Sequence, residues 1–289
     1  MQGRRFASHF ATRRSDMNAE RLTERLTEHL TELASGGPIV VVGDDASEAL
    51  ARAYALRLGA ALLTRETWEA TDPTPVVVWC DAEGPGLRGP PANAAVRRPP
   101  APPVSRPGRD PLVRALGRPA AQLRVVDATA GWGVDAGVLA SAGAHVTMLE
   151  RSPAMALLLE AAVARWRASA HPAAARLTLR EGEATALLAA LPHHDVVYLD
   201  PLFPGRETRA TSAVSLRWLR AVAAWSLADG GDLADDGRLL AAARACALRR
   251  VVVKRARADP FLAGVEPSGS LVGRTTRYDL YPGGAAAPT

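Results

Sequence analysis

The stretch Leu123-Arg-Val-Val-Asp-Ala-Thr-Ala-Gly-Trp-Gly133 decides the fold class of this chain. An apolar strand ends at Asp127 and runs into a turn that carries Gly131 and Gly133, and a helical pattern begins at Val134. Glycines in such a turn let a ligand approach the backbone closely at the carboxyl edge of a sheet. The spacing is not GxGxxG, so it does not specifically indicate a phosphate site on a helix N-terminus.

After this turn the sequence alternates between strands and helices. Strands are predicted at 123–127, 144–150, 176–180, 195–200 and 250–254, and helices at 134–142, 152–168, 184–191, 212–225 and 238–248. This alternation predicts a parallel sheet with helices on both faces. Two further strands, 270–274 and 277–281, predict a terminal antiparallel hairpin, which distinguishes methyltransferases that use S-adenosylmethionine (SAM) from dehydrogenases. The expected fold is α/β, a Rossmann-like class I methyltransferase.

The residues before 123 predict a smaller unit and a linker. Strands at 38–42 and 75–79 and a helix from Ser47 to Leu58, ending at Gly59, indicate a small α/β subdomain. The expected division is an extension with a short amphipathic helix (1–37), the α/β subdomain (38–84), a Pro/Arg-rich linker or arm (85–122), the methyltransferase domain (123–283) and a tail (284–289).

Composition and charge set limits on the function. The net charge is +5, from one lysine and 34 arginines against 30 acids, which permits an anionic partner such as RNA. Seven arginines between 97 and 124 indicate either a solvated linker or a footprint for phosphates. The apolar runs are too short for a membrane span. Cys80 and Cys246 lie in apolar contexts without metal-ligand spacing, so we expect free thiols in a reducing cytoplasm and no metal site.

A second acid closes the next strand. Glu150 follows Gly131 by nineteen residues, where a carboxylate can accept hydrogen bonds from both hydroxyls of a ribose. Many strands end in charged residues, so Glu150 alone is weak evidence. Asp127, Gly131, Gly133 and Glu150 together on neighbouring strand ends favour a nucleoside cofactor, and we predict that they contact SAM.

The segment Asp200-Pro-Leu-Phe203 follows the apolar strand 196–199. It matches the (Asp/Asn)-Pro-Pro-aromatic pattern of methyltransferases that act on exocyclic amines, with Leu202 in place of the second proline. A carboxylate and a backbone carbonyl that accept the two N–H bonds of an amine can orient its nitrogen. We predict that Asp200 and Pro201 take these roles and that Phe203 stacks on the base. The alternative is an Asp-Pro turn with a core phenylalanine.

Five separated blocks then resemble one family. They are 126–135, 146–153, 196–204, 250–255 and 277–281, and they are similar in order and spacing to the RsmJ family of bacterial 16S ribosomal RNA guanine-N2 methyltransferases. The resemblance implies SAM contacts at Asp135, Glu150, Arg151, Gly182, Glu183 and Asp200. Val134 replaces an arginine that the family usually has, and the segment 104–111 and the loop after Phe203 are also atypical.

The resulting hypothesis is methyl transfer from SAM to N2 of a guanosine in 16S ribosomal RNA or the 30S subunit. The basic segments 97–124 and 249–257 would hold phosphates. Two alternatives stay open: methylation of an amine on another RNA, DNA or small molecule, and a non-catalytic RNA-binding assembly factor. Trp132, inside the glycine turn, either shapes the cofactor pocket or packs against the N-terminal subdomain.

Overall fold

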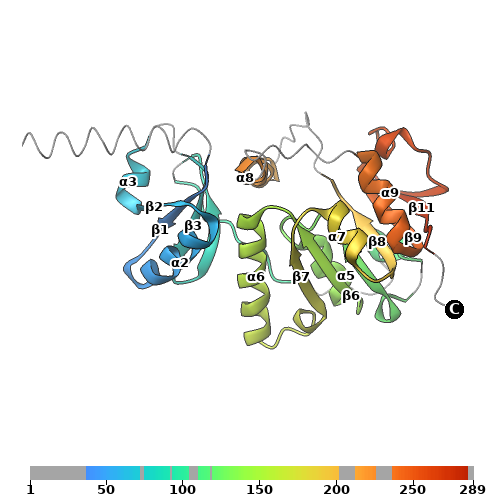
Figure 1. The fold of residues 1–289 in the computed structure, drawn as a ribbon, viewed down its shortest axis with the longest axis horizontal. Helices are drawn as coiled ribbons and strands as arrows, with labels where there is room; N and C mark the ends of the chain where they lie inside the picture. Colours follow the sequence, from blue (N-terminus) through green and yellow to red (C-terminus); the bar gives the residue numbers. More distant parts are fainter. Residues whose placement is uncertain are drawn as a thin grey trace, which may run out of the picture.

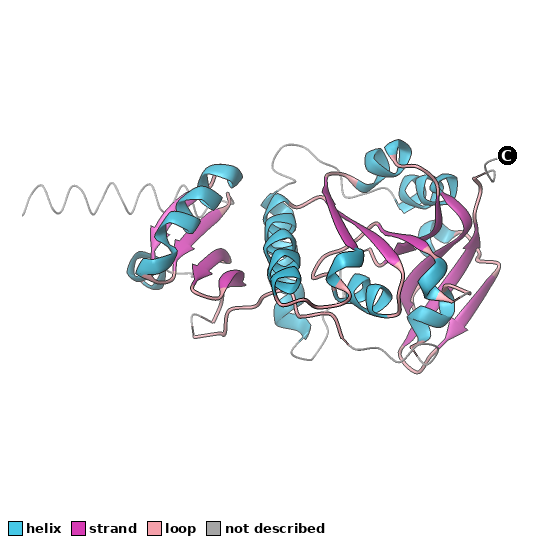
Figure 2. Cartoon of the chain, turned by 90° about the horizontal axis from the view of Figure 1, so that it is seen from below, coloured by secondary structure: helices cyan, strands magenta, loops and turns pink. Residues whose placement is uncertain are grey.

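The computed structural model describes residues 37–71, 75–91, 93–103, 110–117, 119–201, 212–225 and 236–285. These residues form a four-stranded and a seven-stranded sheet. Helix α6 (Pro153–Ala168) lies between the two sheets in both views (Figures 1 and 2). The predicted helix at 18–34 and the last four residues of the predicted tail lie outside the described residues.

The larger sheet has the order β10-β11-β9-β8-β5-β6-β7. Its parallel strands are β5 (Arg124–Asp127), β6 (His145–Glu150), β7 (Leu177–Glu181), β8 (His194–Leu199) and β9 (Ala247–Ala256). The last two strands, β10 (Gly269–Val272) and β11 (Thr276–Pro282), form an antiparallel hairpin, and β11 pairs antiparallel with β9. This confirms the predicted parallel sheet with its terminal hairpin.

Two apolar layers cover this sheet because its strands are apolar at consecutive positions. Val125 and Val196 enter one buried cluster, while Val126 and Val197 enter another on the opposite face. Side chains of successive strand residues point to opposite faces, so continuous valine runs require cover on both. The first face is covered by α4 (Pro111–Ala115), α5 (Val134–Ser141) and α6, and the second by α7 (Ala184–Ala190) and α9 (Asp236–Cys246).

The smaller sheet has the order β2-β1-β3-β4. Its strands are β1 (Ile39–Val42), β2 (Ala61–Thr64), β3 (Val77–Asp81) and β4 (Gly84–Arg88), and helices α2 (Glu48–Leu58) and α3 (Arg65–Glu69) accompany them. Helix α2 ends at Gly59, whose φ of 58° is left-handed, as the sequence indicated. Strands β1, β2 and β3 are parallel, and β4 returns antiparallel to β3.

The predicted linker at 85–122 begins inside this sheet. Strand β4 contains Pro85, which is tolerated because β4 is an edge strand and proline lacks only a ladder donor. The next segment also pairs, since Leu87 and Arg97 form an isolated antiparallel bridge. Strand β2 and helix α3 were not predicted. The helix expected to reach Leu248 ends at Cys246, because the next residue, Ala247, already pairs with His194 of β8.

The two sheets are joined through a shared apolar cluster. Val78 and Leu87 of the smaller sheet pack together with Leu158 of α6 and Trp218 of α8 (Ser212–Trp225). At the edge of this contact Arg57 forms salt bridges with Glu160 (2.6 Å) and Glu181 (3.1 Å). The smaller unit is therefore packed against the methyltransferase part by buried apolar side chains, with exposed ion pairs beside them.

Candidate active site

Three predicted acids meet at the carboxyl edge of the seven-stranded sheet. Asp127 ends β5, Glu150 ends β6, and Asp200 directly follows β8. Strand β5 lies between β6 and β8 and is parallel to both, so their carboxyl ends share one edge. Chain order reverses at this point of the sheet, which is where open α/β folds bind ligands.

The glycine turn is held against Glu150. The N–H of Gly131 donates to Oε2 of Glu150 at 2.9 Å. Gly131 and Gly133 have φ values of 51° and 70°, a region that favours glycine. A Cβ at Gly133 would also lie 2.8 Å from Cδ2 of Leu159 on α6. Both glycines are therefore needed for this turn, one for its conformation and the other also for the close approach of α6.

The Glu150 carboxylate is buried but keeps hydrogen-bonding capacity. Its Oε1 accepts from the N–H of Ser152 at 2.8 Å, and its backbone oxygen accepts from Gly182 at 2.9 Å. Burial raises the pKa of Glu150, and the hydrogen bonds from Ser152 and Gly131 oppose this rise. Each carboxylate oxygen has one backbone donor, and a carboxylate can accept about four hydrogen bonds in total.

Asp200 is fixed from two sides. Its N–H donates to Oγ1 of Thr129 at 2.7 Å, which ties the end of β8 to the turn after β5. Nζ of Lys254, on β9, lies 2.9 Å from Oδ2 of Asp200 and 2.7 Å from Oδ2 of Asp135. Oδ2 of Asp135 also accepts a hydrogen bond from the Tyr198 hydroxyl at 2.6 Å. Strands β8 and β9 and helix α5 thus build one charged cluster.

The pKa values in this cluster are strongly perturbed. Burial and the neighbouring charge of Asp135 raise the pKa of Asp127 to about 8. Burial also raises the pKa of Asp200, while Lys254 opposes that rise. Burial by itself lowers the pKa of Lys254, but Asp200 and Asp135 outweigh it, and the net pKa is raised. At neutral pH Asp127 is therefore mostly protonated and Lys254 is charged.

The remaining predicted site residues fall around this edge. Asp135 is in the first turn of α5, beside Asp200, and Arg151 follows Glu150 directly. Gly182 touches the end of β6 through its N–H, and Glu183 caps α7 at the N–H of Ala184. Pro201 is half-buried next to Asp200. Leu202, Phe203, Arg206 and Arg209 lie outside the described residues, as does the segment 104–109.

Trp132 packs on the side of the small subdomain. Its ring joins the apolar cluster that α6 and α8 share with the first sheet. Its Nε1 is buried and has no hydrogen-bond partner among the described residues. Of the two roles open from the sequence, this contact supports packing between the glycine turn and the N-terminal part.

Lys254, Tyr198 and Thr129 are site residues that the sequence reasoning missed. Segment 249–257, with Lys254 in it, was expected to hold phosphates, but Nζ of Lys254 binds two carboxylates. Arg250 and Arg255 donate to the carbonyls of Ala115 and Pro260. The sequence did contain a signal that sets Lys254 apart, because it is the only lysine in a chain with 34 arginines.

Arginines of the predicted footprint at 97–124 are also used within the fold. Arg98 donates to Glu83 and to the carbonyl of Gly84, and Arg124 donates to the carbonyl of His193. Over the described ranges, no group of three or more His, Cys, Asp or Glu residues is arranged to hold a metal ion. Nor does any helix in that part of the chain have the length and apolarity to cross a membrane.

Comparison with known proteins assigns the family. Residues 104–283 match the family model described as "Putative SAM-dependent methyltransferase", which covers more than half of the chain. The chain belongs to this family of SAM-dependent methyltransferases. Its membership confirms the predicted fold class and agrees with the predicted cofactor.

Two named relatives show which SAM-dependent methyltransferases the chain resembles. The chain is 46% identical over 176 residues to ribosomal RNA small subunit methyltransferase J of Laribacter hongkongensis, a match over 59% of this chain and 60% of the relative. The protein of the same name from Halorhodospira halophila is 46% identical over 180 residues, or 60% of this chain and 65% of that protein. The matches thus span less than two thirds of these relatives. They confirm the resemblance predicted from the five blocks.

A solved structure extends the likeness beyond this region. A SAM-dependent methyltransferase from Neisseria gonorrhoeae superposes with a TM-score of 0.63 at 28% identity, covering 86% of this chain and 96% of that one. This share of the chain is larger than residues 104–283 alone provide, so the likeness continues into the N-terminal part.

Proposed function

We propose that this protein transfers a methyl group from SAM to the exocyclic N2 of a guanosine in 16S ribosomal RNA. The observation that carries the proposal is the placement of Asp200-Pro201 beside the glycine turn, with Asp200 fixed by Thr129 and Lys254. The names of the relatives from Laribacter and Halorhodospira support the choice of small-subunit ribosomal RNA.

The residues at the sheet edge fit SAM. Glu150 offers carboxylate oxygens for the ribose hydroxyls, and Gly131 and Gly133 give the backbone the conformation that a close contact needs. We place Asp135, Arg151, Gly182 and Glu183 around the same cofactor, as the family resemblance implies. When bound, SAM supplies an electrophilic methyl group on a positively charged sulfur.

The charged groups around Lys254 suit the sulfonium cation of SAM. Two carboxyl groups, those of Asp135 and Asp200, share the single ammonium group of Lys254, so acidic groups outnumber basic ones at this contact. A fixed negative charge at a partly buried site stabilises a cationic ligand more strongly than water does. The cluster therefore favours binding of a sulfonium and the positive charge that forms on the attacking nitrogen.

Asp200 and Pro201 would orient the amine. Lys254 holds Oδ2 of Asp200, and we assign Oδ1 to one N–H of the guanine N2 and the carbonyl of Pro201 to the other. Both acceptors stabilise the positive charge that develops on the amine nitrogen as this nitrogen attacks the methyl group. Asp200 is the group that can then accept the proton that the nitrogen loses. Phe203 would stack on the base. Lys254 and Thr129 act as positioning residues for Asp200.

We infer that the partner is 16S ribosomal RNA or the 30S subunit and that the protein works in the cytoplasm. Buried Cys80 and Cys246 are free thiols, which fits a reducing compartment.

A methylation assay tests the function directly. Purified protein, radiolabelled SAM and 30S subunits or free 16S RNA should yield labelled N2-methylguanosine, identified by mass spectrometry of nuclease digests. Labelling of a different amine would replace the substrate assignment. SAM binding by calorimetry without transfer to any ribosomal substrate would favour the non-catalytic assembly factor instead.

A further inference from the structure

Tyr198 is a buried polar residue at the sheet edge to which the proposed methyl transfer gives no role. It lies in β8 between Val197 and Leu199, and it is only 1% exposed. Its hydroxyl donates to Oδ2 of Asp135 on α5 at 2.6 Å. A buried tyrosine hydroxyl needs a partner, whereas an apolar side chain would fill the same layer without one. The position therefore holds a hydrogen-bond donor for Asp135 that packing alone does not require.

Asp135 is held through one of its two carboxylate oxygens. Its Oδ2 accepts from the Tyr198 hydroxyl and also lies 2.7 Å from Nζ of Lys254. Among the described residues no other side chain donates to this carboxylate, so Oδ1 is left for a ligand at the same edge. The Asp135 side chain is 21% exposed and lies in the first turn of α5, where the helix dipole favours a negative charge.

The Tyr198 hydroxyl keeps its proton at neutral pH. Its burial, followed by the charges of Asp200 and Asp135, raises the pKa of Tyr198 well above its ordinary value. A phenol that stays protonated supplies a hydrogen bond but no positive charge. Lys254 differs, because it brings a charge and divides it between Asp135 and Asp200. Tyr198 is therefore the donor that holds Asp135 without neutralising it.

The sheet edge limits where the sulfur of SAM can lie. The methyl group has to point at the amine that Asp200 would hold, so the sulfonium lies close to that contact. Asp135 and Asp200 are both within 2.9 Å of Nζ of Lys254, which places Asp135 on the sulfonium side of the site. Glu150, which would take the ribose, ends β6 on the other side of β5. Asp135 is thus the carboxylate nearer to the sulfur, and Glu150 the one nearer to the ribose.

Charge distinguishes the cofactor from its product. Loss of the methyl group converts the sulfonium of SAM into the neutral thioether of S-adenosylhomocysteine (SAH). A carboxylate fixed beside the sulfur in a partly buried place therefore favours SAM over SAH. The same carboxylate would lose this preference if it were free to turn toward water, where its charge is screened.

We propose that Tyr198 is a positioning residue that sets the preference of the site for SAM over SAH by holding Asp135 beside the sulfonium. The inference rests on the proposed function for the direction in which the methyl group points, whereas SAM as the cofactor follows from the family. It divides the cluster into two parts, with Tyr198 and Asp135 recognising the charge of the cofactor and Asp200 orienting the amine.

Calorimetry of the full-length protein with SAM and with SAH, in the absence of RNA, tests the proposal. Tyr198→Phe keeps the ring and removes the hydroxyl, so it should weaken SAM binding on the order of tenfold and SAH binding by less than about twofold. Unchanged SAM affinity would overturn the proposal. An equal loss for SAM and SAH would do so as well, because Asp135 would then face a group that both molecules share.

Tyr281→Phe is the matched control. Tyr281 is also 1% exposed, and its hydroxyl donates to the carbonyl of Val265 at 3.0 Å on the opposite face of the same sheet. The control removes the same group at the same burial, so both affinities should stay at those of the parent protein. Urea unfolding compares the stability of the two variants. A loss of the preference for SAM in Tyr281→Phe as well would trace it to general destabilisation and overturn the role of Tyr198.

A double-mutant cycle shows whether Tyr198 acts through Asp135. Asp135→Asn keeps the shape of the side chain and removes its charge, so it should lower the preference for SAM over SAH by itself. Tyr198→Phe should then weaken SAM binding by less than about twofold more, because the two substitutions remove one shared contribution. Fully additive losses would mean that Tyr198 acts independently of Asp135, and the positioning role would be wrong.

Methylation of 16S RNA separates this inference from the proposed function. Tyr198→Phe should raise the KM for SAM with little change in kcat, since the lost contact concerns the bound cofactor. A fall in kcat at unchanged KM would instead overturn the role in cofactor recognition. If the parent protein methylates no ribosomal substrate, the proposed function fails, while the affinities for SAM and SAH still decide the role of Tyr198. If it methylates 16S RNA and Tyr198→Phe binds both molecules as the parent does, only this inference fails.

Discussion

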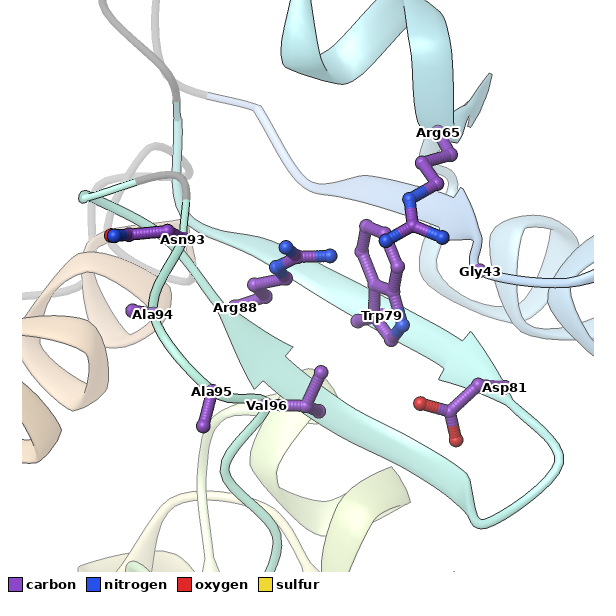
Figure 3. A pocket seen from close by; sticks show the side chains of 9 residues that line it. All are labelled: Gly43, Arg65, Trp79, Asp81, Arg88, Asn93, Ala94, Ala95 and Val96. Atoms are coloured by element: carbon purple, nitrogen blue, oxygen red, sulfur yellow. The ribbon is translucent and has the colours of Figure 1, made fainter.

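The carboxyl edge of the seven-stranded sheet and the Trp79 face of the four-stranded sheet treat charge in different ways. At the edge, Asp135 and Asp200 share Lys254 within 2.9 Å, so the carboxylates are fixed before any substrate arrives. On the Trp79 face, Arg65 and Arg88 rest on an indole. Prearranged ion pairs suit a transition state, whose charge appears at one defined atom. The two guanidinium groups are instead placed against an aromatic ring (Figure 3), and Arg65 also pairs with Glu69 on its own helix.

The largest effect on methyl transfer is expected from a substitution of Asp200 at the sheet edge. Asp200→Asn should lower the rate of methyl transfer about 10²- to 10³-fold, because an amide holds the amine less well and cannot take its proton. Single-turnover transfer from radiolabelled SAM measures this, with calorimetry showing a much smaller change in SAM affinity. Asp195→Asn, on the same strand and bonded to the N–H of Arg124, is the control. Unchanged transfer by Asp200→Asn would refute the assigned mechanism.

A smaller loss is expected at Lys254. Lys254→Met should reduce transfer about 10- to 100-fold, since Asp200 loses its positioning partner. Activity requires ionised Asp200 and falls as pH falls through its pKa. Lys254 opposes the raised pKa of Asp200, so its removal raises that pKa further and moves the acid limb of the pH–rate profile to higher pH. Lys254→Arg keeps a positive charge beside Asp200, so the acid limb of its pH–rate profile should stay closer to that of the parent protein. If the role of Lys254 were purely structural, Lys254→Met would lower the rate without moving the acid limb of the pH–rate profile.

Asp127 allows the same edge to be tested through stability. Its pKa is about 8 in the folded protein against an ordinary value of 3.8, so the folded state holds its proton more tightly than the unfolded state does. The stabilisation is therefore fully present below about pH 4 and is lost as pH rises through 8. Asp127→Asn keeps an acceptor for the N–H of Thr129 and should remove this dependence, on the order of 1 to 3 kcal/mol. Urea unfolding at pH 5 and pH 9 measures it.

The comparison also separates what the sequence could predict from what it could not. Consecutive valines in β5, β8 and β9 indicated a doubly covered sheet because local periodicity reports burial directly. The positions of the Asp127 to Gly133 turn and of Asp200 were predictable as well, because both directly follow predicted strands and strand ends mark the edge of the sheet. Membership of the family then confirmed SAM, which the sequence had predicted, as the cofactor.

Contacts between distant segments were not predictable from local patterns. Lys254 meets Asp135 across 119 residues of sequence, and only the pairing of β9 beside β8 brings them together. Strand β4, with Gly84, Pro85 and Gly86, has the composition of a turn, and its pairing with β3 overrides that local preference.

The smallest expected effect concerns how the two regions are held together. Arg57 joins α2 to Glu160 and Glu181, but all three side chains are at least 40% exposed. Exposed ion pairs contribute about 0 to 1 kcal/mol, so Arg57→Gln should hardly change the free energy of unfolding. Leu87→Ala, in the buried cluster shared with α6 and α8, should cost about 2 to 5 kcal/mol. If Arg57→Gln instead cost more than Leu87→Ala in urea unfolding, the smaller sheet would be held to the methyltransferase part by charge, and salt should then loosen that contact along with RNA binding.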